Sequence, residues 1–212
     1  WSKGKKYYLV SGSDLPKMKE QVGVLYLSRA QGLFNCGGNQ FYDSKENLIY
    51  ENKFKVPQTL LTYLGLQVRL SDTPVISTNH REDRGSMLNF SVVGRNCTQE
   101  ERDKYFEWDK EVGERKKIAN EIMKGWPELD AVIGGQISID IVPKGYDKSQ
   151  VLKHIEEREN ADEYIFIGDR TEEGGNDYPL AKRMNDTQNC RVFQTEGPDQ
   201  TMEILQTIEA EK

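Results

Sequence analysis

The chain has 212 residues, 36% of them hydrophobic, which is enough to bury one full core or two smaller ones. Its formal net charge of −6 at pH 7 argues against nucleic acid as the main partner, since a phosphate backbone needs a basic surface. A mean hydropathy of −0.76, with no long apolar run, excludes a membrane-spanning segment. The three cysteines, Cys36, Cys97 and Cys190, fit neither a disulfide framework nor a zinc site, so we expect free thiols in a reducing, cytoplasmic compartment.

The first predicted elements are a strand over residues 7–10, a polar turn and a helix. Pro16 suits the first helical turn, Ser13 or Asp14 can cap the helix, and Gly23 can end it. The hydroxyl of Ser11 lies beside free N–H groups at this helix start, where it can hold a phosphate oxygen. The alternative for Ser11 is a role in the turn alone.

The middle of the chain predicts an antiparallel sheet with one face covered, because three segments alternate apolar and polar residues: 75–80, 87–93 and 137–142. The covering helices are easier to recognise. Thr98 and Glu101 have the spacing of a capping box, and an amphipathic helical region runs from there to about Lys124, with an interruption near Gly113.

Three arginines, Arg84, Arg95 and Arg102, flank one of these strands and the helix turn that follows it. Their guanidinium groups can converge there, and arginine is the side chain best suited to bidentate phosphate recognition. The alternative is salt bridging at the surface with neighbouring acidic residues: Glu82, Glu100 and Glu101.

Two further features follow strands in the last third of the chain. Lys148 precedes a helix expected over residues 150–157, where a lysine can neutralise a phosphoryl group. An apolar strand over residues 164–167 leads into a loop in which Gly174 and Gly175 can return the chain towards Asp169. Hard oxygen ligands on such a loop suit Mg²⁺, and the candidates are Asp169, Asn176 and Asp177. The alternative is that Asn176 or Asp177 caps the next helix.

The chain is expected to form two domains, one inserted in the other. Residues 1–54 and 147–212 alternate short apolar strands with helices in the manner of a parallel sheet, ending with a strand at 190–193 and a helix at 199–210. Residues 55–146 form the insert.

In this order, the hydroxyl turn, the long insert, the lysine at a helix start and the Gly-Asp…Gly-Gly-Asn-Asp loop resemble the haloacid dehalogenase (HAD) superfamily. Within it, residues 87–102 and 134–148 are similar to the eukaryotic-type phosphomannomutases. The resemblance runs from about Tyr7 to about Met184. It implies an α/β fold with a HAD-like Rossmannoid core built on a parallel sheet, plus an inserted α+β cap with an antiparallel sheet and helices.

The resemblance also implies a mechanism, namely Mg²⁺-dependent phosphoryl transfer between mannose 1-phosphate and mannose 6-phosphate through an aspartyl-phosphate, with a hexose 1,6-bisphosphate as activator. Ser11 and Lys148 would orient and stabilise the transferring group, beside metal ligands drawn from Asp169, Asn176 and Asp177. The non-reacting phosphate and the sugar hydroxyls would be bound by residues of the cap: Arg84, Arg95, Arg102 and Ser138 for the phosphate, and Asp140 for the hydroxyls. A homodimer through the cap is expected on the same ground.

The chain departs from that family in one respect, because it contains no Asp-x-Asp-Gly-Thr motif to supply the phosphoryl acceptor. We expect that motif on a segment upstream of Trp1, and we expect the chain as written not to turn over; a degenerate member without the nucleophile is the alternative. Three functions stay open: a sugar-phosphate mutase, a HAD sugar-phosphate phosphatase and a non-catalytic sugar-phosphate binder.

Overall fold

The structure is a computed structural model that describes residues 5–211. The chain divides into two compact units, one formed by the segment up to Tyr50 together with the segment from Asp147 onward, and one by Glu51–Tyr146. The sequence placed residues 51–54 in the first domain, but the structure groups them with the second unit. There, Phe54 donates its backbone N–H to Gly85 O and packs against the core of that unit. Within residues 5–211, no helix is both long and apolar enough to cross a membrane.

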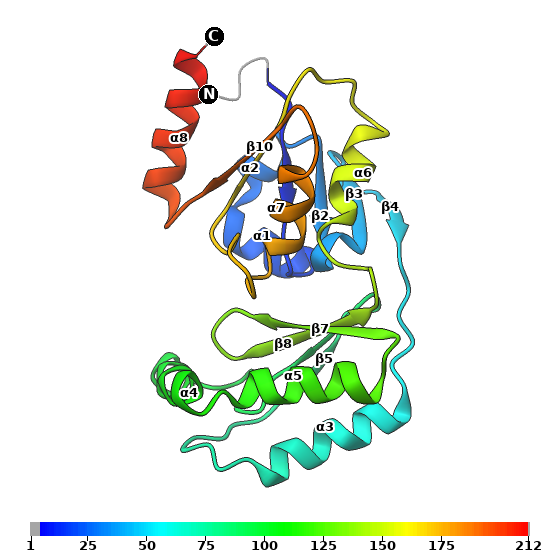
Figure 1. The fold of residues 1–212 in the computed structure, drawn as a ribbon, viewed down its shortest axis with the longest axis vertical. Helices are drawn as coiled ribbons and strands as arrows, with labels where there is room; N and C mark the ends of the chain where they lie inside the picture. The colour runs from blue at the N-terminus through cyan, green and yellow to red at the C-terminus, as the bar shows by residue number, and fades with distance from the viewer. Residues whose placement is uncertain (1–4, 212) are drawn as a thin grey trace. The chain divides into compact units, whose positions relative to one another are not determined.

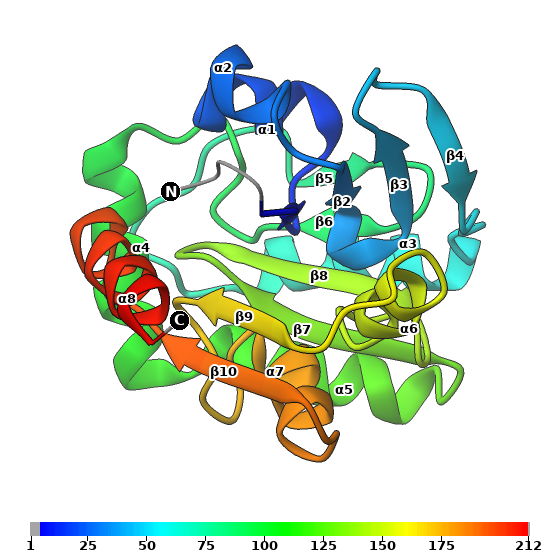
Figure 2. The same ribbon diagram turned by 90° about the horizontal axis from the view of Figure 1, so that it is seen from above.

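The first unit contains two sheets (Figures 1 and 2). One has the order β1-β2-β3-β4, in which β1 pairs with β2 in parallel and β2 with β3 antiparallel. The other is the parallel pair β10-β9. The strands span these residues: β1 Tyr8–Val10, β2 Gly32–Asn35, β3 Gln40–Asp43, β4 Leu48–Glu51, β9 Tyr164–Gly168 and β10 Cys190–Gln194.

Four helices of the first unit pack in two groups, one against each face of β2. Leu33 joins a core cluster with Met18 of α1 and Leu27 of α2, whereas the next residue, Phe34, packs with Leu152 of α6 and Leu180 of α7. Because successive strand residues point to opposite faces, α1 and α2 cover one face of β2, and α6 and α7 the other. The helices span α1 Leu15–Val22, α2 Val24–Leu27, α6 Gln150–Glu156, α7 Tyr178–Asn185 and α8 Pro198–Ala210, with a short 3₁₀ helix at Cys36–Gly38.

The second unit is an antiparallel sheet of order β5-β6-β8-β7, with α3, α4 and α5 on one face (Figure 1). Its elements are α3 Gln58–Leu70, β5 Arg81–Asp83, β6 Leu88–Phe90, α4 Gln99–Val112, α5 Glu114–Gly125, β7 Leu129–Gly134 and β8 Ser138–Pro143. Leu88 and Phe90 of β6, and Ile139 and Ile141 of β8, point into the core beneath the helices. The residues between them, Asn89 and Asp140, therefore lie on the other face of the sheet.

Local signals in the sequence predicted the helix ends correctly. Asp14 caps α1 by accepting a hydrogen bond from Lys17 N. Thr98 and Glu101 form the expected capping box at the start of α4. The helical region that follows is interrupted at Gly113, which has a left-handed backbone with φ of 69°. Each of these devices lies within a few residues of the helix end, which is why the sequence alone reveals them.

One strand prediction in the second unit was wrong, and two strands were missed. Residues 75–80 do not form a strand, and β5 and β7 were not predicted. Asn79 has a left-handed backbone with φ of 61°, which breaks the extended conformation before β5 begins. This segment still forms backbone hydrogen bonds with the residues that follow β6, from Ser77 N to Val93 O at 2.7 Å and from Arg95 N to Asn79 O at 2.9 Å. The three cysteines are free thiols, as expected.

Candidate functional site

The loop between β9 and α7 brings one of its acidic residues to a buried lysine. Asp177 occupies the N-cap position of α7 but makes no side-chain capping hydrogen bond. Instead, its Oδ1 accepts from Lys148 Nζ at 2.5 Å, and its Oδ2 accepts from Arg170 N at 3.3 Å. The side chain of Asp177 therefore does not cap the helix, which was the alternative role for it. Its carboxylate instead contacts Lys148, the lysine expected to neutralise a phosphoryl group.

Glycine allows this loop to close. A Cβ atom added at Gly175 would lie 2.1 Å from Arg170 O, and Gly174 has φ of 88°. Asp177 N donates to Arg170 O at 3.1 Å, which completes the turn. The sequence predicted this return of the chain from its paired glycines, and only glycine fits so close to the backbone of Arg170.

Asp169 lies next to Asp177 at the carboxyl end of β9. Loss of hydration around its carboxyl group, although the residue as a whole is exposed, raises the pKa of Asp169 above its ordinary value. The negative charge of Asp177 raises this pKa further, and a hydrogen bond between the two side chains acts in the same direction. Two carboxyl groups held this close favour either a shared proton or a cation between them.

Asn176 adds a third oxygen to this loop. Its side-chain Oδ1 is buried and has no hydrogen-bond partner among the described residues. A buried carbonyl oxygen without a donor is costly, and a metal ion is one partner that such an oxygen can take. Within residues 5–211, no group of three His, Cys, Asp or Glu side chains forms a cation site. Two carboxylates and one amide oxygen fit Mg²⁺, which keeps several waters and needs few protein ligands.

Ser11 lies in the turn between β1 and α1. Its Oγ accepts a hydrogen bond from Ser13 N at 3.0 Å, so the turn role proposed as the alternative is present. This bond uses the hydroxyl oxygen as an acceptor, which leaves its proton to be donated. The backbone N–H groups of Cys36 and Gly37 donate back to this turn, to Ser13 O and Ser11 O at 2.9 Å each.

Asn35, at the end of β2, is a polar residue of this region that sequence reasoning missed. Its side chain is fully buried, and among the described residues neither its amide nitrogen nor its oxygen has a hydrogen-bond partner. The preceding residue, Phe34, accepts a hydrogen bond from Ser11 N at 2.9 Å, so Asn35 adjoins the Ser11 turn. The signal in the sequence was an amide directly after the apolar run of a strand.

A row of polar residues crosses the sheet of the second unit. Glu82 of β5 lies opposite Asn89 of β6, which lies opposite Asp140 of β8. Asn89 Nδ2 donates to Asp140 Oδ1 at 2.6 Å. A Cβ atom added at Gly134 would lie 2.7 Å from Asp140 Oδ2, so the strand next to Asp140 has no room for a side chain there. The register of three strands thus gathers these side chains on the face away from the helices.

Arg95 and Arg84 join this row. Arg95 Nη1 donates to Asn89 Oδ1 at 2.6 Å and to Ser138 Oγ at 3.2 Å, and Arg95 Nε lies 3.2 Å from Glu82 Oε2. Arg84 donates to the same Glu82 oxygen from Nε at 3.1 Å and from Nη2 at 2.5 Å. Glu82 and Asn89 are members of this polar region that were not predicted from the sequence. Four of the five residues predicted for substrate binding also belong to it: Arg84, Arg95, Ser138 and Asp140.

Arg102 is the fifth predicted residue, and the structure does not connect it to the others. It lies in the first turn of α4, where Arg102 N donates to Thr98 O at 2.9 Å. Its guanidinium group makes no hydrogen bond or ion pair with any of the described residues. The salt bridges proposed as the alternative for it do not form, because Glu100 pairs with Lys104 and Glu101 completes the capping box.

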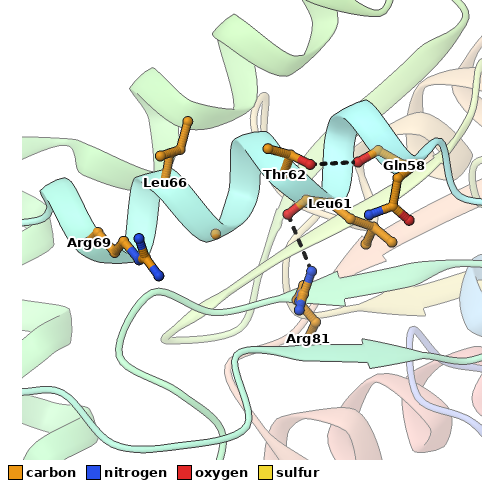
Figure 3. A pocket seen from close by; sticks show the side chains of 7 residues that line it. Gln58, Leu61, Thr62, Leu66, Arg69 and Arg81 are labelled. Carbon is orange, nitrogen blue, oxygen red and sulfur yellow. Dashed lines mark hydrogen bonds between the residues drawn. The ribbon is translucent and has the colours of Figure 1, made fainter.

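The second unit also has a hollow of about 340 Å³ between α3 and the start of β5 (Figure 3). Leu61, Leu66 and Arg69 line it, and Arg81 Nη1 donates to Leu61 O at 3.2 Å across it. None of the predicted site residues takes part in this hollow.

A family model for eukaryotic phosphomannomutase matches residues 3–211 of the chain. The chain is 39% identical over 178 residues to a phosphomannomutase of Encephalitozoon cuniculi, covering 81% of this chain and 69% of that protein. It is 34% identical over 209 residues to a phosphomannomutase of Drosophila melanogaster, covering 94% of this chain and 80% of that protein.

Solved structures with little sequence identity share the fold. An IMP-bound, N-terminally truncated IMP-nucleotidase of Plasmodium falciparum has a TM-score of 0.61 at 15% identity, covering 98% of this chain and 60% of that one. A haloacid dehalogenase-like hydrolase of Bacteroides thetaiotaomicron has a TM-score of 0.54 at 18% identity, covering 85% and 73%. These similarities confirm the expected α/β fold with a HAD-like core and an inserted cap.

Proposed function

Because the chain belongs to the eukaryotic phosphomannomutase family, we propose that it serves the interconversion of mannose 1-phosphate and mannose 6-phosphate by phosphoryl transfer. The observation that carries the proposal is that the one chain gathers two different groups of residues suited to binding phosphate. The first unit holds carboxylates beside a buried lysine, and the second holds two arginines that share the carboxylate of Glu82. A mutase needs both, because its bisphosphate intermediate carries two phosphates, whereas a phosphatase needs only the first.

In the first unit, the proposed site handles the phosphoryl group that moves. Lys148 brings a positive charge that can stabilise the transferring group, and the Ser11 hydroxyl can donate a hydrogen bond that orients it. Phosphotransferases of this superfamily generally depend on Mg²⁺, which Asp169, Asn176 and Asp177 would hold and which would neutralise charge on the phosphoryl oxygens. These 212 residues do not supply the acceptor carboxylate of the proposed chemistry, since they contain no Asp-x-Asp motif.

In the second unit, the proposed site holds the phosphate that does not react. Arg95 is already ordered by Asn89 and Ser138, so its guanidinium group can receive a phosphate with little loss of side-chain freedom. Arg84 and Arg102 would add charge, and the carboxylate of Asp140 can accept hydrogen bonds from sugar hydroxyls. We propose a hexose 1,6-bisphosphate as the activator, because it presents a phosphate to each kind of site.

A homodimer and a cytoplasmic location complete the proposal. The second unit exposes three large apolar side chains: Leu66 at 48%, Leu70 at 73% and Ile76 at 57%. Leu66 and Leu70 stand one turn apart on α3, and Leu66 also lines the hollow of Figure 3. A second copy of the chain covering this part of α3 would bury Leu66 and Leu70. The reducing cytoplasm suits three free thiols.

Phosphorus NMR tests the proposed reaction directly. Protein expressed from its complete coding sequence would be incubated with mannose 1-phosphate, Mg²⁺ and a catalytic amount of hexose 1,6-bisphosphate. Conversion to mannose 6-phosphate supports the mutase. Release of inorganic phosphate without isomerisation would establish the phosphatase instead, and saturable binding without either reaction would establish a sugar-phosphate binder.

A further inference from the structure

A single carboxylate oxygen joins two of the proposed phosphate ligands. Glu82 Oε2 accepts from Arg84 Nε at 3.1 Å and Arg84 Nη2 at 2.5 Å, and it lies 3.2 Å from Arg95 Nε. We propose that Glu82 is a positioning residue, which holds the two guanidinium groups together so that they receive one phosphate. This inference rests on the proposed function, because it takes Arg84 and Arg95 as phosphate ligands.

The buried guanidinium group of Arg84 needs a negatively charged partner, and Glu82 is that partner. The Arg84 side chain is only 6% exposed, compared with 21% for Arg95 and 35% for Glu82. A guanidinium group so far removed from water needs a negative partner, since its charge cannot be neutralised by losing a proton. Glu82 supplies that charge from β5, two residues before Arg84, which directly follows the strand.

The ion pair with Glu82 occupies one side of the Arg95 guanidinium group. Arg95 meets Glu82 through Nε, whereas its Nη1 donates to Asn89 and Ser138. Its Nη2 makes no hydrogen bond with the described residues. Contacts to Glu82, Asn89 and Ser138 thus fix the plane of the group and leave an N–H edge for a ligand. Since long side chains lose conformational freedom on binding, an arginine that is already ordered binds phosphate more tightly.

Two opposite outcomes separate positioning from competition. If Glu82 merely competed with phosphate for the arginines, its neutralisation would strengthen phosphate binding, because one negative charge near the anion would be lost. If Glu82 positions the arginines, the same change weakens binding. The sign of the effect therefore decides the proposal.

Calorimetric titration of the full chain with mannose 6-phosphate measures that sign. We expect Glu82→Gln to weaken binding about tenfold, because the negative charge that orders the two arginines is lost. The matched control is Glu100→Gln, which removes the same charge from the second unit at a site paired with Lys104 rather than with the arginines. Its affinity should stay within about twofold of the wild type. An unchanged or tighter affinity in Glu82→Gln overturns the proposal.

A ligand-free measurement separates this proposal from the proposed function. Nitrogen-15 NMR of the arginine side chains should show the Nε–H groups of Arg84 and Arg95 protected from exchange in the wild type and unprotected in Glu82→Gln. Equal protection in both proteins would show that Glu82 does not order the arginines. Failure of the wild type to bind mannose 6-phosphate would instead refute the proposed function, whatever the NMR result.

A second variant covers the case in which Glu82→Gln does not fold. Glu82→Asp keeps the charge beside the buried Arg84 but withdraws the carboxylate by one methylene group. We expect it to fold, to bind mannose 6-phosphate more weakly than the wild type, and to lose the protection of the Arg95 Nε–H. Wild-type affinity together with wild-type protection would count against positioning by Glu82.

Discussion

Lys148 and Asp177 form a buried ion pair between two segments that lie 29 residues apart, with 2.5 Å between Nζ and Oδ1 and 8% exposure of each side chain. Lys148 precedes α6 and Asp177 precedes α7, so the pair joins the starts of two helices on the same side of β2. Removal of either partner leaves a buried charge uncompensated.

Lys148→Met is therefore expected to destabilise the chain by roughly 3–5 kcal/mol, measured by urea unfolding in the absence of metal. The control is Lys17→Met, which breaks the exposed pair of Lys17 with Glu20. That change should cost less than about 1 kcal/mol. Similar losses in the two variants would show that the Lys148 pair is not buried in solution.

The stability of the second unit should depend on pH through the side chain of Glu114. Burial raises the pKa of Glu114 above its ordinary value, and the charges of Asp109 and Asp72 add to the effect, while hydrogen bonds from Ser71 and Tyr105 oppose it. A carboxyl group with a raised folded-state pKa binds its proton more tightly in the folded state. The stability that this tighter proton binding contributes is fully present below the unfolded-state pKa of about 4.3. It is lost as the pH rises through the folded-state pKa.

Glu114→Gln should abolish this loss, because glutamine is neutral and its side-chain oxygen can still accept from Tyr105 Oη, which lies 3.0 Å from Glu114 Oε2. At pH 7 the variant should be more stable than the wild type by about 1 kcal/mol or less, with no advantage near pH 4. Free energies of unfolding from pH 3.5 to 8 test this. Glu107→Gln, on the exposed side of α4, is the control and should show no such crossover.

We expect Asp169 and Asn176 to bind Mg²⁺ whether or not the chain is catalytically active. Mg²⁺ should raise the melting temperature of the wild-type chain, since a ligand that binds the folded state stabilises it. Asp169→Asn and Asn176→Ala should each weaken Mg²⁺ binding about tenfold or more, as measured by calorimetric titration. Asp186→Asn, at the exposed end of α7, should bind Mg²⁺ like the wild type. Wild-type affinity in both test variants would rule out the loop as a magnesium site.

Removal of the Arg102 side chain and removal of the Arg95 side chain should differ in their effect on the free energy of unfolding. Arg102 has no side-chain partner among the described residues, whereas Arg95 bonds to Asn89 and Ser138. Each alanine variant should lose about 1.5–3 kcal/mol of binding energy for mannose 6-phosphate, the usual value of a charged hydrogen bond. Only Arg95→Ala should also lower the free energy of unfolding, because it leaves buried polar groups unpaired.

Titration calorimetry and urea unfolding of the same preparations measure both effects. Lys104→Ala, two residues further along α4 and paired with Glu100, provides the control for the loss of a positive charge. Unchanged binding in both arginine variants would refute the phosphate site of the second unit.

The sequence by itself determined the features that depend on near neighbours. The cap of α1 at Asp14, the capping box at Thr98 and the interruption at Gly113 were all predicted, since each is made within a single turn of helix. The glycine turn that returns the chain to Asp177 was predicted for the same reason. The strand proposed at 75–80 failed, because apolar alternation alone does not reveal the left-handed residue at Asn79.

Only the tertiary structure decided which side chains meet. Nothing in the sequence shows that Asp177 turns from its helix to Lys148, or that Glu82 lies between Arg84 and Arg95. These contacts depend on strand register and on loop closure between distant segments, where a shift of one residue turns every side chain to the opposite face. The sequence thus determined the local conformation and the residue types of each site. Packing decided the partners, because side-chain contacts are set by the sheet and not by the order of residues along the chain.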